Sequence, residues 1–136
     1  MDKKASELLG ESVIAGVMLE AGESVRKMIG GAVPLIIAGV ESLKAAVPGD
    51  HKGLHYVAVG PSKVGFFSLK RGAFKPSLGE LLVECPRDEV VAVEIKKGAM
   101  PPVHFVLADG TDYVLLCARV NLRKLKKVKA LLTGES

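Results

Sequence analysis

Aromatic side chains are scarce in this sequence of 136 residues, which has four phenylalanines, two tyrosines and no tryptophan. Proteins that bind single-stranded nucleic acid stack the bases on aromatic rings, so this shortage argues against nucleic acid as the main ligand. The apolar fraction of 49% and the charged fraction of 25% are those of an average globular protein. The chain is therefore neither a disordered tail nor a fibrous repeat, and its length suits one domain.

Long hydrophobic runs are also missing. The longest stretch without a charged residue is 28–40, which has 13 residues, whereas a helix that spans a bilayer needs about 20. Glu7, Glu11, Glu20 and Glu23 interrupt the apolar stretch that a signal peptide would require. These features predict a cytoplasmic protein, with peripheral attachment to a membrane as the alternative.

Residues that could carry chemistry are few and far apart in the sequence. The two cysteines, Cys85 and Cys117, lack the spacing of a zinc site, so we expect reduced, buried thiols. A triad of Cys85, His104 and Asp109 can be imagined, but nothing in their spacing favours it. The histidines are expected at isolated surface or strand positions; they are His51, His55 and His104. We predict no catalytic residue, no metal and no cofactor.

Nucleotide-binding loops are not found. Gly60 and Gly65 have the spacing of the outer glycines of a phosphate-binding loop, but Phe66 stands where a lysine must reach the phosphates. No Gly-x-Gly-x-x-Gly motif occurs. We therefore expect no nucleotide among the ligands.

The chain divides near residues 48–50, where a proline, a glycine and an aspartate are consecutive. We expect a main β-domain over 51–136. The preceding segment, 1–50, holds a strand and a kinked helical stretch, and it packs on the main domain or is swapped with it. Within 11–20 the apolar residues alternate with a period of two, which favours a strand.

Between residues 23 and 47 apolar side chains recur at intervals of three and four, the signature of a helix. Pro34 cannot donate a backbone hydrogen bond, so the pattern predicts two helices, over 23–29 and 34–46. We expect this segment to pair with a second copy in a homo-oligomer; a membrane interface or the chain's own sheet are the alternatives. The residues expected at the self-association contact are Met28, Ile29, Leu35, Ile36 and Val40.

The second part of the chain alternates short apolar runs with turn residues, which predicts antiparallel strands. Strands so close in sequence cannot be parallel, since a parallel pair needs a crossover of about a dozen residues. In one of them, Val91, Val93 and Ile95 are expected on a single face. The expected strands are 54–59, 63–69, 81–85, 89–96, 103–107 and 113–118.

The last predicted element is a helix from about 122 to 132, with Asn121 as its N-cap. An apolar stripe that begins at Leu122 and ends at Leu132 is expected to cover the sheet. Residues 119–129 include six basic side chains and no acid. Such a basic element can face an anionic membrane, a phosphate or only water.

Antiparallel strands followed by one capping helix resemble a pleckstrin-homology-like (PH-like) domain. Three stretches are similar to hairpins of bacterial PH-like proteins of the actinobacterial type: YVAVGPSKVGFF (56–67), GELLVECPRDEVV (79–91) and FVLADGTDYV (105–114). The resemblance covers roughly 54–132. It implies an α+β fold, a small antiparallel β-sandwich or partly open barrel with a C-terminal helix. It also implies a binding function, with anionic lipids as ligands of some members and peptides or self-assembly in others.

Lipid-binding members carry spaced basic residues across the first hairpin, although the spaced final arginine of their pattern is missing here. The loop 70–76 sets Phe74 among three cations, which suits contact with a membrane surface. We predict a non-enzymatic binding or scaffolding module that self-associates, and peripheral binding to anionic membrane lipid is the alternative. The contact residues would be Lys70, Arg71, Phe74 and Lys75 in the loop and Arg123, Lys124, Lys126 and Lys127 in the helix.

Overall fold

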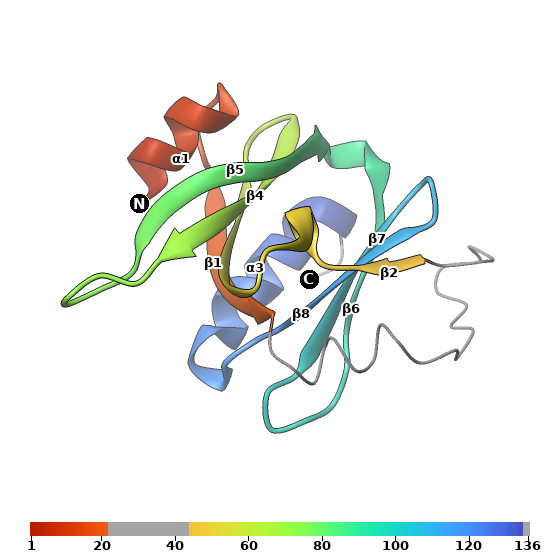
Figure 1. The fold of residues 1–136 in the computed structure, drawn as a ribbon. Helices are drawn as coiled ribbons and strands as arrows, with labels where there is room; N and C mark the ends of the chain where they lie inside the picture. The colour runs from red at the N-terminus through yellow and green to blue at the C-terminus, as the bar shows by residue number, and fades with distance from the viewer. Residues whose placement is uncertain (22–43, 135–136) are drawn as a thin grey trace.

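The computed structural model describes residues 1–21 and 44–134, which form eight strands and two α-helices (Figure 1). The helices are α1 (Asp2–Leu9) and α3 (Leu122–Thr133). Short 3-10 turns occupy Pro48–Asp50, Arg87–Glu89 and Arg119–Asn121. The strands are β1 (Ala15–Ala21), β2 (Lys44–Ala46), β3 (Gly53–Val59), β4 (Lys63–Lys70), β5 (Ser77–Pro86), β6 (Val90–Ile95), β7 (Pro102–Leu107) and β8 (Thr111–Leu116).

The strands form one largely antiparallel sheet with the order β5-β4-β3-β1-β8-β7-β6, and β2 pairs with β8 off this path. Within the described residues no pairing joins β5 to β6, so the sheet is not closed. The predicted α+β class, the antiparallel strands of the second part and the C-terminal helix are confirmed. The strand predicted within 11–20 is also confirmed, as β1.

β1 lies in the middle of the sheet. It pairs with β3 along its whole length, from Ala15 opposite Val59 to Ala21 opposite Gly53, and it meets β8 where Glu20 lies opposite Leu116. Every second residue of β1 is buried, as expected of a strand whose side chains alternate between two faces. The first segment of the chain therefore supplies a central strand of the fold.

The larger core lies between the sheet and α3. Leu125 and Val128 of α3 are fully buried and pack against β1 and β6. Phe66 and Phe105 meet edge to face in this core, with ring centroids 5.4 Å apart. The predicted apolar stripe of the helix is thus confirmed as the face that covers the sheet.

A smaller core lies on the opposite face of the sheet, under α1. Phe66 and Phe67 are neighbours in β4, and they belong to the two different cores. Ala5 and Leu9 of α1 are buried against β4 and β5. This helix was not among the predicted elements.

Asn121 is the N-cap residue of α3, as predicted, but its side chain makes no capping hydrogen bond. Its amide Nδ2 donates to the backbone oxygen of Met18 at 3.4 Å. One prediction about the face of a strand residue was wrong. Val91 is 42% exposed and does not share a face with Val93. A register shift between Val90 and Ala92 turns it outward.

The prediction of a helix over 34–46 fails at its C-terminal end. Residues 44–46 form β2, which runs parallel to β8 with Lys44 opposite Thr111. The expectation of antiparallel pairs applied only to strands that are close in sequence. β2 and β8 are more than sixty residues apart, so a parallel pair is possible. The predicted helix 23–29 and residues 34–43 of the second one lie outside the described residues.

Candidate functional site

The loop 70–76 joins β4 to β5, and at its tip the side chain of Phe74 is fully exposed. Lys70, Arg71 and Lys75 are exposed beside it. Gly72 makes this turn possible, because a Cβ there would overlap the carbonyl oxygen of Lys75. The ring does not fold back onto the sheet, and the loop presents one large apolar group among three cations.

The N-terminus of the chain extends this loop surface. Met1 and Lys4 line a pocket of about 490 Å³ together with Lys70, Lys75 and Leu78. The ammonium Nζ of Lys4 donates to the backbone oxygen of Leu78 at 3.0 Å, which fixes the start of α1 beside β5. Met1 is 47% exposed. A second apolar group and a fourth cation therefore lie near the loop, a contribution that only the folded chain reveals.

The basic side chains of α3 point away from the core. Because Leu125 and Val128 are buried, the cations between them occupy the outer face of the helix. The predicted contact residues are all exposed; they are Arg123, Lys124, Lys126 and Lys127.

One of these cations, Lys126, also lines a groove of about 800 Å³ between α3 and the loop 96–101. The loop and the helix are more than twenty residues apart in sequence and meet only in the folded chain, so no local sequence pattern predicts the groove. The basic residues that line the groove are Lys96, Lys97, Arg119, Lys126 and Lys129.

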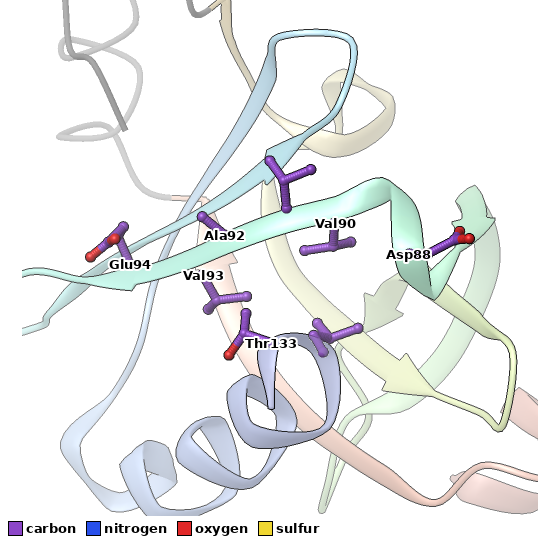
Figure 2. Close-up of a pocket in the computed structure, with 8 residues that line it drawn as sticks. Asp88, Val90, Ala92, Val93, Glu94 and Thr133 are labelled. Atoms are coloured by element: carbon purple, nitrogen blue, oxygen red, sulfur yellow. The ribbon is translucent and has the colours of Figure 1, made fainter. Parts of the chain in front are cut away.

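A third cavity, of about 500 Å³, lies between β6 and the C-terminal end of α3 (Figure 2). Val90 and Val93 contribute its apolar wall, and Thr133 stands opposite them on the helix. Asp88 and Glu94 lie at its two ends, and their carboxylates point away from it. This cavity holds no cation among its described lining residues.

The imagined catalytic triad is not assembled in the described structure. Nδ1 of His104 lies 2.8 Å from Oδ2 of Asp112, and both side chains are buried. Asp109 instead accepts a hydrogen bond from the backbone N–H of Thr111 in the hairpin turn. Burial, followed by the charge of the nearby Glu89, raises the pKa of Cys85 to about 11, so this thiol is protonated at neutral pH.

His55 lies in β3 and His104 in β7, so the expected strand positions are confirmed for these two histidines, and both are buried. His51 and His55 are not isolated, because their rings meet edge to face at a centroid separation of 5.0 Å. The spacing of four residues between His51 and His55 is the feature of the sequence that could have predicted their contact. No group of three or more metal-binding side chains occurs in the described part of the chain.

The predicted self-association residues, 28, 29, 35, 36 and 40, lie outside the described residues, so this contact stays a prediction. No α-helix of the described ranges has the length and apolarity needed to cross a bilayer. No protein-family model, curated protein or solved structure matches the chain.

Proposed function

We propose that this chain is a non-enzymatic binding module with a PH-like fold, which attaches reversibly to anionic membrane surfaces through the loop 70–76. The order of the elements supports the first part of this proposal. Strands β1, β3, β4 and β5 lie side by side in sequence order, β6, β7 and β8 do the same, and α3 packs on β1 and β6. Antiparallel strands followed by one capping helix are what the resemblance implies.

The observation that carries the membrane proposal is the full exposure of Phe74 between cationic neighbours. An exposed ring of this size gains about 2 kcal/mol when it leaves water. Each cation near an anionic bilayer contributes about 1 kcal/mol. The ring with Lys70, Arg71 and Lys75 would then give a dissociation constant on the order of 0.1 mM. Attachment of this strength is reversible and sensitive to salt.

Self-association would strengthen such weak attachment. A second copy brings a second loop to the same surface, and a linked pair of weak contacts binds far more tightly than either one alone. The oligomeric state therefore belongs to the proposal. Light scattering at micromolar concentration measures it, and a monomeric mass would contradict this part without touching the loop.

Vesicle flotation tests the loop. We expect the protein to float with phosphatidylcholine vesicles that contain phosphatidylserine, and not with phosphatidylcholine alone, and we expect 0.5 M salt to release it. Phe74→Ser and Lys70→Glu should each reduce the bound fraction at low salt. Lys52→Glu is the matched control, since it makes the same charge change at an exposed lysine of another loop.

Two results would overturn the loop assignment. The first is the absence of flotation on anionic vesicles at any salt concentration. The second is an equal loss of binding in Lys70→Glu and Lys52→Glu, which would indicate a response to net charge alone. A selective loss in Lys124→Glu would move the contact from the loop to the exposed face of α3.

A further inference from the structure

The groove between α3 and the loop 96–101 has a strongly basic lining. Five basic residues line it, and none of its described lining residues is acidic. The whole chain has a formal net charge of only +4. The rest of the protein is therefore slightly negative, so an anion near the surface is drawn to this groove.

The groove is held open by hydrogen bonds within the protein. The guanidinium of Arg119 donates from Nε to the backbone oxygen of Ala99 at 3.3 Å and from Nη2 to that of Gly98 at 3.2 Å. These bonds tie the loop that carries Lys96 and Lys97 to the turn before α3. The lysines of the loop thus line the same groove as Lys126 of the helix before any ligand arrives.

The lining also restricts the kind of anion. Ile95, Pro101 and Leu122 supply the apolar part of the wall, and none of the described lining residues is aromatic. A nucleobase would find no ring on which to stack. Lysine ammonium groups bind phosphate oxygens as point charges, and a volume of about 800 Å³ is in the range of small-ligand sites.

The placement of the cations favours more than one phosphate. Lys126 lines the groove from the helix, and Lys96 and Lys97 line it from the loop. Cations from two sides of one groove can each bind a different phosphate group as point charges. We propose that this groove binds a ligand that carries several clustered phosphate groups and no aromatic ring, either free in solution or as the headgroup of a lipid.

Isothermal titration calorimetry with sodium tripolyphosphate tests the site without a membrane. We expect binding that strengthens from inorganic phosphate to pyrophosphate to tripolyphosphate and weakens with added salt. ATP should bind no more tightly than tripolyphosphate, because its base gains no contact. Lys97→Gln and Lys126→Gln should each weaken binding roughly fivefold, the equivalent of one lost cation.

Lys127→Gln is the matched control, since Lys127 is the next residue on the same helix, is exposed and does not line the groove. It should leave the affinity for tripolyphosphate unchanged, and so should Phe74→Ser. The absence of binding up to 10 mM tripolyphosphate would overturn the proposal. Equal weakening by Lys126→Gln and Lys127→Gln would also overturn it, because that result indicates diffuse attraction to the helix. Circular dichroism melts of each variant confirm that the fold is intact.

A flotation arm identifies the source of the phosphates. If a lipid headgroup is the ligand, Lys97→Gln and Lys126→Gln reduce flotation on vesicles that contain cardiolipin, whose headgroup carries two phosphates, whereas Lys127→Gln does not. If the ligand is a free polyphosphate, the titration effects remain and flotation is unchanged. Calorimetry tests the groove and does not depend on Phe74, whereas the effect of Phe74→Ser on flotation tests the loop. The two proposals can therefore fail independently of each other.

Discussion

Asp112 on β8 forms a buried pair with His104 on the neighbouring strand β7. The carboxylate Oδ2 lies 2.8 Å from the ring nitrogen Nδ1, and both side chains are only 3% exposed. The other carboxylate oxygen of Asp112 has no hydrogen-bond partner among the described residues. Buried polar groups of this kind depend on each other, because loss of one leaves the other desolvated without compensation.

The first prediction follows from this pair. Asp112→Ala should lower the free energy of unfolding by about 3 kcal/mol, since it leaves His104 buried without its partner. Asp88→Ala removes an exposed carboxylate and should change stability by less than about 0.5 kcal/mol. Urea denaturation followed by circular dichroism measures both. Equal effects of the two substitutions would show that the pair contributes nothing specific.

The second prediction concerns His55, whose burial lowers its pKa below the ordinary value. Its ring donates from Nδ1 to the backbone oxygen of Gly53 at 3.1 Å, while Nε2 has no hydrogen-bond partner in the described part of the chain. The unfolded chain takes up a proton near pH 6.5, and the folded chain does so only at lower pH. Below pH 6.5 the unfolded state therefore binds more protons, so stability should fall as the pH falls.

Urea denaturation at pH 7.5 and at pH 5.0 checks this dependence. The wild-type protein should be less stable at pH 5.0, and His55→Gln should lose most of that difference because it cannot be protonated. His51→Gln keeps His55 and should retain most of the difference. A wild-type difference that persists in His55→Gln would assign the pH effect to another group.

The antiparallel strands could be predicted because their signals are local. Asp109 and Gly110 form the turn between β7 and β8, and Asp109 accepts a hydrogen bond from the N–H of Thr111 there. Gly110 has a φ of 93°, which glycine adopts readily. Turn chemistry and the alternation of apolar residues are both contained in a few neighbouring residues.

The elements that were missed depend on distant contacts. An isolated helix of eight residues is not stable in water, and α1 exists because Ala5 and Leu9 pack on strands more than fifty residues away. β2 pairs with a strand in the last third of the chain. The exposed loop around Phe74 could be predicted because its residues are neighbours in sequence. Lys97 and Lys126 line the same groove only in the folded chain, so the groove could not be predicted.

The third prediction concerns Gly16 and Tyr56, which lie on adjacent strands β1 and β3. A Cβ at position 16 would overlap the ring and hydroxyl of Tyr56. That hydroxyl donates to Asp2 at the start of α1. Gly16→Ala should therefore displace the ring and cost about 1–3 kcal/mol of stability.

A double-mutant cycle isolates this contact. In a Tyr56→Ala background the overlap is gone, so the further cost of Gly16→Ala should fall well below its cost in the wild-type protein. Tyr56→Phe keeps the ring and removes the hydrogen bond to Asp2, which separates packing from tethering of α1. The same cost of Gly16→Ala in both backgrounds would refute the overlap as its cause.

The fourth prediction distinguishes a structural thiol from a catalytic one at Cys85. Because its pKa is raised to about 11, the reactive thiolate is rare at pH 8, and alkylation should be roughly 100-fold slower than that of a free cysteine. Iodoacetamide labelling of Cys117→Ala, followed by mass spectrometry across a range of pH, measures this rate. It should keep rising up to about pH 11. A rate that levels off below pH 8 would indicate an activated nucleophile and would contradict a non-enzymatic function.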